Sequence, residues 1–510
     1  MERQKISVIF PCFMKGLYKS GQRWFAIMRI ITRCVIYNEK MKGKSGGGYI
    51  MSDKICSSAD KVLEVFLENA PMDTSHHRMV KQQNKCGYGL QGVCCRLCSN
   101  GPCRLSPAKP KGVCGADADT IACRNFLRQV AAGSGCYTHV VENTARRLKE
   151  MAQELQAEGK KPKYKDSVAK LAKILQINCC GNCGEGCPYN CAETAEMIAD
   201  AVLADIRKPY DEKMTLMKHI ALSKRYEVWE KLGILPGGAK DEIFNAVVKT
   251  STNLNSDPMD MLLQCLRLGI STGNYGLILT NLMNDIIMGP PQISMDPVGF
   301  RIIDPEYINI MITGHQQSMF ADLEEKLESE IVQKSAELVG AKGIRIVGCT
   351  CGGLENCGLM TMDAVELCGK GLKEICTALG VPPVLNFGPC LAIGRIEMAA
   401  CALAKELNVD LPQLPVVISA PQWLEEQALA DGAYALALGF PLHLALSPFV
   451  TGSQVAVNVL TEGLKNLTGG QLIIETEVDA AAQKFDEIIK EKRAGLGIDN
   501  GINKGGDAIC

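Results

Sequence analysis

The spacing of apolar residues changes in character about halfway along the chain. From Ser52 to about Met288, apolar side chains recur every three or four positions, as in the run that begins at Ala59 and again between Met259 and Leu266. This period places them on one face of an α-helix. The first half of the chain is therefore predicted to be helical.

From about Tyr307 short β-rich runs alternate with helical segments. The predicted strands are Ile308–Ile312, Gly343–Gly348, Pro383–Phe387, Pro415–Ser419 and Gln471–Glu475. Helical patterns such as Trp423–Leu438 and Ala456–Leu464 lie among them. Alternating strands and helices are typical of a doubly wound parallel sheet. The expected fold is α/β, with an N-terminal helical domain and a doubly wound parallel sheet in the C-terminal half.

These patterns divide the chain into four expected parts. Residues 1–50 form a basic arm, 51–300 a helical domain that carries cysteines for iron–sulfur clusters, 301–495 a Rossmann-like α/β domain with the active-site ligands, and 496–510 a tail. No part of the sequence predicts a membrane span, since the apolar stretch from Trp24 to Ile36 is short and contains arginines.

The basic arm differs in charge from the rest of the chain. It holds ten Lys and Arg against two Glu, a net charge of +8, which leaves −9 for residues 51–510 of a chain whose total is −1. A run of glycines, Gly46–Gly48, lies just before Met51. Glycine codons begin with GG, so a purine-rich ribosome-binding sequence that is translated in frame would produce such a run a few codons before the true start. Translation is expected to begin at Met51, and a targeting peptide or a nucleic-acid arm is the alternative. The acidic remainder does not favour nucleic-acid binding.

The chain has 25 cysteines, and many of them occur in groups. Grouped cysteines indicate metal sites in a reducing compartment, here the cytoplasm, rather than a secreted disulfide framework. The densest group places six within 29 residues: Cys86, Cys94, Cys95, Cys98, Cys103 and Cys114. Its mixed C-x2-C and C-x4-C spacing favours [4Fe-4S] clusters over a zinc ribbon, in which two CxxC pairs lie well apart.

A second group has a regular spacing of four residues. It comprises Cys179, Cys183, Cys187 and Cys191. Such a loop can surround another cubane cluster, and a zinc site or a cysteine-rich surface loop is the alternative. The isolated thiols are expected to be small apolar core residues; they include Cys56, Cys123, Cys136, Cys265, Cys368, Cys376, Cys401 and Cys510.

Further candidate ligands follow three of the predicted strands. His315, then Cys349 and Cys351, and finally Cys390 come directly after strand-like runs. Ligands of open α/β sheets bind beyond the carboxyl ends of the strands. These side chains are therefore expected to converge on one rim, with Cys349 as a spare thiol.

Several long motifs resemble one known family. The stretches CGYGLQGVCCRLCSNGPCRL, GVCGADADTIACRNFLRQVAAG, NYGLILTNLMNDIIMGPPQ, YINIMITGH and APQWLEEQALADGAYALALG are similar to the catalytic subunits of anaerobic nickel–iron–sulfur carbon monoxide dehydrogenases, which are related to hybrid-cluster proteins. The resemblance implies that Cys86 and Cys94 help to hold a cluster shared across a homodimer axis. It also implies that the next four cysteines, Cys95, Cys98, Cys103 and Cys114, hold a second cubane in each subunit.

The resemblance assigns the catalytic cluster as well. A Ni-Fe-S cluster, or a modified iron–sulfur cluster, would be held by His315, Cys351 and Cys390, with Cys357 as a further ligand. Only 39 residue steps separate Cys351 from Cys390, so a domain-sized piece of the family is missing. By alignment Gln427 stands where the family has an active-site lysine. The family's ladder of proton-conducting histidines is reduced here to His139 at most.

Three functions are compatible with these observations. The first is oxidation of CO with water to CO2, with electrons passed to a ferredoxin-like carrier. The second is a hybrid-cluster-like reductase of hydroxylamine or another small N–O species, which the missing lysine and histidines favour. The third is a non-catalytic electron-transfer or redox-sensing protein. In each case the expected assembly is a homodimer that has no membrane span and does not bind nucleic acid.

Overall fold

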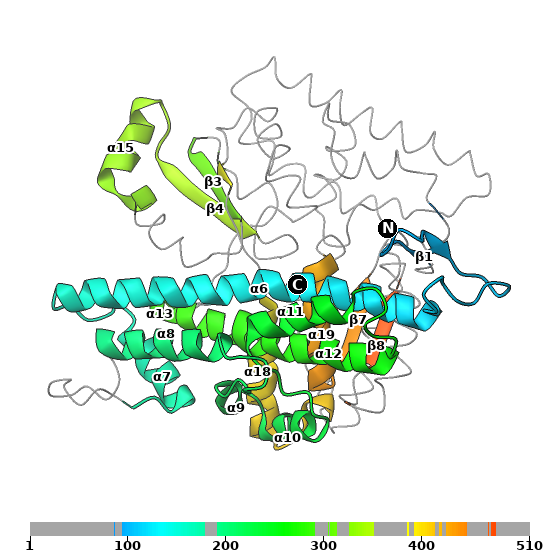
Figure 1. Cartoon of the computed structure of the whole chain (residues 1–510). Helices are drawn as coiled ribbons and strands as arrows, with labels where there is room; N and C mark the ends of the chain where they lie inside the picture. Colours follow the sequence, from blue (N-terminus) through cyan, green and yellow to red (C-terminus); the bar gives the residue numbers. More distant parts are fainter. Residues whose placement is uncertain are drawn as a thin grey trace, which may run out of the picture.

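The computed structural model is shown in Figure 1. It describes Cys86 and residues 94–178, 191–290, 304, 306–313, 326–350, 385–386, 392–413, 418–420, 425–445, 468 and 471–475. The expected arm of residues 1–50, the tail of residues 496–510 and the predicted helix Ala456–Leu464 lie outside this set.

A long helix, α6 (Ala118–Ala157), runs along the helical part of the molecule (Figure 1). Asp117 caps its start, because its carboxylate accepts a hydrogen bond from the backbone N–H of Thr120 at 2.9 Å, and this bond lowers the pKa of Asp117. The other helices of the first half are α7 (Lys165–Leu175), α8 (Ala192–Ile206), α9 (Met217–Ile220), α10 (Ser223–Lys231), α11 (Ala239–Lys249), α12 (Pro258–Ser271) and α13 (Thr280–Ile287). The predicted helical first half is thus confirmed for the described residues. Among the described residues, no helix combines the length and the apolar character needed to cross a bilayer.

A π-helical segment, η1 (Thr272–Leu279), joins α12 to α13, and all of its residues are buried. Segments of this kind are rare and are found often at functional sites. Two helices from the second half of the chain, α18 (Ala392–Leu407) and α19 (Glu425–Leu438), pack against η1. The helical core is therefore built from both halves of the sequence.

Two glycines allow α19 to approach its neighbours closely. A Cβ atom on Gly133 of α6 would lie 1.9 Å from the carbonyl oxygen of Glu426, and one on Gly269 of α12 would lie 2.5 Å from the backbone of Ala433. Neither position can accept a side chain without moving α19. The indole N–H of Trp229 adds a hydrogen bond of 2.8 Å to the carbonyl of Ala437. These contacts fix α19 within the helical core.

The second half also contains parallel strands, as predicted. In one sheet β3 (Ile308–Thr313) lies between β4 (Ile344–Thr350) and β5 (Leu385–Asn386). In the other, β7 (Pro441–Ala445) lies between β6 (Ile418–Ala420) and β8 (Gln471–Glu475). Strand β7 was not predicted. The helix α15 (Glu330–Leu338) precedes β4, and a short 3₁₀ turn, η5 (Leu411–Gln413), follows α18.

The expected single doubly wound sheet is not confirmed. Within the described residues of the second half, the strands form two separate three-stranded parallel sheets, and helices dominate the structure as a whole. One feature of doubly wound folds is nevertheless present. The chain passes from β3 to β4 on one side and then to β5 on the other, so the strand order reverses at β3. In open α/β sheets, such a reversal point is where ligands bind.

Candidate functional site

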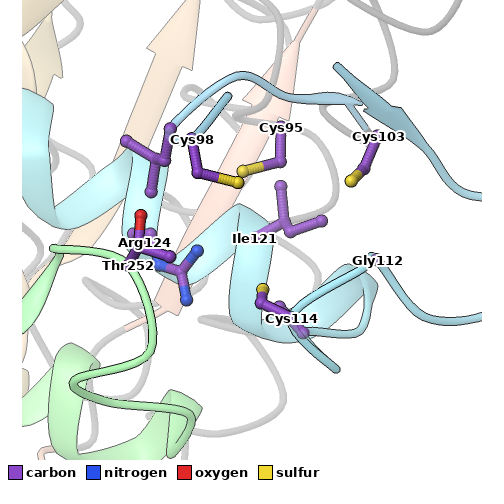
Figure 2. A pocket seen from close by; sticks show the side chains of 10 residues that line it. Cys95, Cys98, Cys103, Gly112, Cys114, Ile121, Arg124 and Thr252 are labelled. Atoms are coloured by element: carbon purple, nitrogen blue, oxygen red, sulfur yellow. The ribbon is translucent and has the colours of Figure 1, made fainter. Parts of the chain in front are cut away.

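Four cysteines surround one pocket at the start of α6. They are Cys95, Cys98, Cys103 and Cys114, and the pocket is also lined by Gly112, Ile121 and Arg124. Figure 2 shows the four sulfur atoms pointing into the same space. None of the four thiols is in a disulfide. The structure thus brings together the four cysteines to which the sequence assigned one cluster.

Local backbone structure places these thiols. The strands β1 (Cys94–Cys95) and β2 (Cys103–Arg104) are antiparallel, and Cys95 lies directly opposite Cys103. Side chains of directly opposed residues lie on the same face of a sheet. Between the strands the chain turns at Cys98, whose carbonyl accepts a hydrogen bond from the N–H of Gly101 at 3.1 Å.

A second loop completes the pocket with Cys114. The backbone N–H of Val113 donates a hydrogen bond of 3.5 Å to the sulfur of Cys103. Hydrogen bonds of this kind to sulfur are among the interactions by which proteins adjust iron–sulfur clusters. The loop therefore supplies both a thiol and an amide donor to the same site.

Cys94 and Cys86 do not line this pocket. Successive side chains of a strand point to opposite faces, so Cys94 faces away from its neighbour Cys95. Cys86 is exposed, and Cys94 is partly exposed. This geometry separates the pair from the four-cysteine set, and their assignment to a cluster shared between two subunits stays a prediction.

Arg124 gives the pocket a positive charge that the sequence analysis did not anticipate. The residue is 2% exposed, and its Nε and Nη1 atoms have no hydrogen-bond partner among the described residues. Its Nη2 atom donates weakly to the carbonyl oxygen of Asn255 at 3.5 Å. A buried guanidinium is costly unless an anion lies beside it. Since a cluster ligated by four thiolates is anionic, the unmatched charge of Arg124 fits such a group.

The arrangement fits a cluster better than a single ion. Within the part of the chain that the structure describes, no three His, Cys, Asp or Glu side chains lie close enough to share one metal ion. The four thiols of a zinc site converge on one ion, whereas those of a cubane each bind a different iron and stay farther apart. A pocket lined by four separated thiols therefore favours the iron–sulfur interpretation.

The isolated thiols of the helical core differ from these four. Cys123 and Cys265 are buried, as predicted, and Cys136 and Cys401 are partly exposed. Burial raises the pKa of the Cys123 thiol to about 12, and also raises the pKa of Cys265. These two thiols are therefore protonated core residues and poor metal ligands.

The second cysteine group is described only at its end. Cys191 caps α8, and its sulfur accepts a hydrogen bond from the N–H of Thr194 at 3.4 Å. Cys179, Cys183 and Cys187 lie outside the described residues. The proposal of a further cluster there stays a prediction.

The candidate ligands of the rim also fall outside the described residues: His315, Cys351, Cys357 and Cys390. The strands that precede them are described, and their carboxyl ends lie together. Thr313, at the end of β3, pairs with Thr350, at the end of β4. In the same sheet Met311 pairs with Asn386 of β5. Three chain segments that lead to candidate ligands therefore leave one edge of the sheet side by side.

Gln427 and His139 lie in contrasting surroundings. Gln427 belongs to the first turn of α19 and is 6% exposed. His139 lies on the exposed side of α6 and forms a hydrogen bond of 3.2 Å with Asn143. The remaining histidine of this stretch thus faces away from the buried core of the described residues.

Comparison with known proteins identifies the family. The sequence model of the Prismane/CO dehydrogenase family matches residues 93–357 and 347–479. A carbon monoxide dehydrogenase of Methanocaldococcus jannaschii is 34% identical over an alignment that covers 87% of this chain and 100% of the relative. One of Methanopyrus kandleri is 33% identical, with coverage of 88% and 98%.

A solved structure agrees with these relatives. A nickel-free carbon monoxide dehydrogenase from Thermococcus sp. AM4 matches with a TM-score of 0.70 at 25% identity, and the match covers 89% of this chain and all of the other. The alignment with the Methanocaldococcus jannaschii relative spans 633 positions, more than the 510 residues of this chain, so the relative has segments without a counterpart here. The family model matches this chain in two parts, which meet and overlap at residues 347–357. A break in the match at this point supports the prediction that a piece is missing after Cys351. The resemblance inferred from the cysteine motifs is confirmed, and the chain belongs to the Prismane/CO dehydrogenase family.

Proposed function

We propose that this protein is an iron–sulfur oxidoreductase of the carbon monoxide dehydrogenase type, which oxidises CO with water to CO2, two protons and two electrons. The observation that carries the proposal is the pocket of Cys95, Cys98, Cys103 and Cys114 beside the unmatched charge of Arg124. A [4Fe-4S] cluster held there would accept and release single electrons on the way to a ferredoxin-like carrier.

Two groups of residues would define the ends of the electron path. The four thiols would fix the cluster, the N–H of Val113 would donate to one of its ligands, and the Arg124 guanidinium would offset its negative charge. The substrate would bind at the edge of the sheet where β3, β4 and β5 end. There His315, Cys351, Cys357 and Cys390 would hold a nickel–iron–sulfur or a modified iron–sulfur cluster, at the edge where the strand order reverses at β3.

A second candidate reaction is favoured by the surroundings of Gln427. An amide cannot supply the positive charge that would stabilise a carboxylate forming from CO. Reduction of hydroxylamine to ammonia and water has no such requirement and consumes two electrons and two protons. The exposed position of His139 also fits a changed proton path.

The two reactions can be distinguished on anaerobically reconstituted protein with and without nickel. CO-dependent viologen reduction that requires nickel supports the first reaction, and hydroxylamine-dependent viologen oxidation with iron alone supports the second. Nickel close to one atom per subunit in the native protein would agree with the first. If neither reaction occurs although the iron–sulfur clusters are assembled, the proposed enzyme function is wrong.

The homodimer is tested through the two cysteines outside the pocket. Two ligands per chain leave a cubane half satisfied unless a symmetry-related chain completes it, and two-fold dimers are the commonest assembly. A Cys86→Ser/Cys94→Ser variant is therefore expected to lose about four iron atoms per dimer, the content of one cubane. Iron analysis with analytical ultracentrifugation measures both properties. Unchanged iron content and unchanged dimerisation would exclude the shared cluster.

Arg124 is expected to set the reduction potential of the four-cysteine cluster. A positive charge close to the cluster stabilises its more negative, reduced form. An Arg124→Met variant should therefore have a lower midpoint potential at full iron content, and Arg124→Lys should shift it less. A redox titration followed by electron paramagnetic resonance measures this. Equal potentials in the native protein and in Arg124→Met would contradict an electrostatic role.

A further inference from the structure

Two carboxyl groups are buried in the helical core, and the charge of one acts on the other. Glu397 of α18 is 0% exposed, and Asp431 of α19 is 2% exposed. Neither oxygen of Glu397 has a hydrogen-bond partner among the described residues, nor does Oδ1 of Asp431. The other oxygen of Asp431 accepts a hydrogen bond of 2.9 Å from the hydroxyl of Tyr137 on α6. Buried acids usually have partners, so this pair requires an explanation.

Among the described residues, no positively charged side chain forms an ion pair with either acid of the pair, Glu397 or Asp431. The titratable groups around it are Tyr137 of α6, Tyr434 of α19 and Cys401 of α18. Burial raises the pKa of the Tyr434 hydroxyl and raises that of the Cys401 thiol to about 12.

The remaining neighbours are neutral or more remote. The π-helix η1 contributes Asn274, whose Oδ1 accepts a hydrogen bond from the Tyr434 hydroxyl at 3.4 Å. Lys405 lies farther along α18 and is exposed, and it acts on the thiol of Cys401. Because these described neighbours are neutral when protonated, they favour carboxyl groups that carry their protons.

The protonation of the two acids follows from this environment. Burial raises the pKa of Glu397 well above its ordinary value, and the negative charge of Asp431 adds to the effect. Burial also raises the pKa of Asp431 from 3.8 to about 7, although the Tyr137 hydroxyl acts in the opposite direction. The raised pKa of Asp431 lies close to neutral pH, as a group that takes up and releases a proton there requires.

The position of the pair connects it with the candidate redox centre. Helix α18 begins at Ala392, two residues after Cys390, and α19 contains Gln427 in its first turn. At a rise of 1.5 Å per residue, Glu397 lies about 8 Å and Asp431 about 9 Å along their helices. The two acids thus lie at similar depth below the starts of the two helices. Asp431 is also one helical turn from Gln427, on the same face of α19.

We propose that Glu397 and Asp431 form a proton-binding site that exchanges protons with the redox centre at the starts of α18 and α19. When the pair gives up a proton, an O–H bond of a carboxylic acid breaks and the proton passes to an acceptor of the centre. When the pair takes up a proton, a donor of the centre loses it and an O–H bond forms on a carboxylate. Proton binding by the pair is independent of the reaction, whereas the exchange with the centre rests on the proposed function. CO oxidation would deliver protons to the pair, and hydroxylamine reduction would draw protons from it.

Infrared spectroscopy of the full-length protein tests proton binding without substrate. At pH 6 the native protein should show the C=O stretching band of buried protonated carboxyl groups, shifted in D2O. Glu397→Gln and Asp431→Asn should each remove part of this band. The matched control Glu406→Gln, at an exposed position of the same helix, should leave it unchanged. A band that both core variants retain, or ionised carboxylates at these positions, would overturn the proposal.

The reduced-minus-oxidised infrared difference spectrum tests the exchange with the centre. Reduction of the reconstituted clusters should change the carboxyl band of the native protein, and the change should be absent in Asp431→Asn. A difference spectrum without any carboxyl change would overturn the exchange, while proton binding would stand. Failure of the proposed function alone would appear as an intact carboxyl band in a protein that turns over neither CO nor hydroxylamine.

Protein stability gives an independent readout with a defined sign. Because the folded-state pKa of Asp431 is raised, its protonated carboxyl favours the folded state below pH 3.8, and this contribution is lost as the pH rises to about 7. The amide that Asp431→Asn introduces does not titrate, so the denaturation midpoint of this variant should rise relative to the native protein between these pH values. A midpoint difference that does not change with pH would contradict the raised pKa.

Discussion

Replacing Cys98 with serine is expected to remove about four iron atoms from each chain, the content of one cubane, and to stop electron transfer to external carriers. Cys98 lies in the turn between β1 and β2, and its sulfur points into the pocket with three other thiols (Figure 2). Serine offers a hard oxygen ligand where the cluster needs a soft thiolate. Iron and acid-labile sulfide analysis after anaerobic reconstitution measures the loss.

A cysteine outside the pocket provides the control. Cys136 also belongs to the first half of the chain, is partly exposed like Cys98 and lies on α6 away from the pocket lining. Cys136→Ser should keep the full iron content and the paramagnetic signal of the reduced cluster. If Cys98→Ser retains both as well, the four-cysteine pocket does not hold a cluster.

The dense cysteine group could be recognised in the sequence because its geometry is local, and the family resemblance separated four of its members from the other two. All four thiols come from 20 residues, and short backbone contacts, such as the pairing of Cys95 with Cys103, bring them together. Arg124 was missed, although a signal was present. It lies three residues from both Ile121 and Leu127, which are buried on the same side of α6, and so it is a charged residue on an apolar helix face.

Strand positions were predictable, but their arrangement into sheets was not. The β-rich runs correspond to five of the six parallel strands, because buried parallel strands are short apolar runs. Strand β7 was missed since it begins with Pro441 and contains His443. Proline is accepted at the first position of a strand, so it does not exclude one. The separation into two sheets depends on contacts between distant segments, which a periodic pattern does not contain.

Helix α19 illustrates the same limit for the core. Its sequence is rich in alanine and leucine, which predicts a helix that is apolar on most of its faces. The pattern does not indicate which other elements cover those faces. The partners of α19 include α6 and α12, and the close contacts at Gly133 and Gly269 explain why small residues stand there. The buried positions of Glu397 and Asp431 follow from this packing, whereas acidic residues are normally exposed.

The second large effect is expected at Gln427. Formation of a carboxylate from CO requires a fixed positive donor, and loss of one such contact typically lowers the rate about a hundredfold to a thousandfold. The native protein is therefore expected to oxidise CO slowly. Gln427→Lys should raise the rate by a similar factor, because it places an ammonium group at a buried position. Asp431, one turn along α19, can stabilise that charge.

CO-dependent viologen reduction by nickel-reconstituted protein measures this effect, and Gln427→Met is the matched control. Methionine has the length of glutamine without a charge, so this variant should remain as slow as the native protein. A higher rate of CO oxidation in Gln427→Lys but not in Gln427→Met would show that charge, rather than packing at the start of α19, limits the reaction. Fast, nickel-dependent CO oxidation by the native protein would instead show that Gln427 does not occupy the position of the catalytic lysine. Equal rates in all three proteins would place the charge requirement elsewhere in the site.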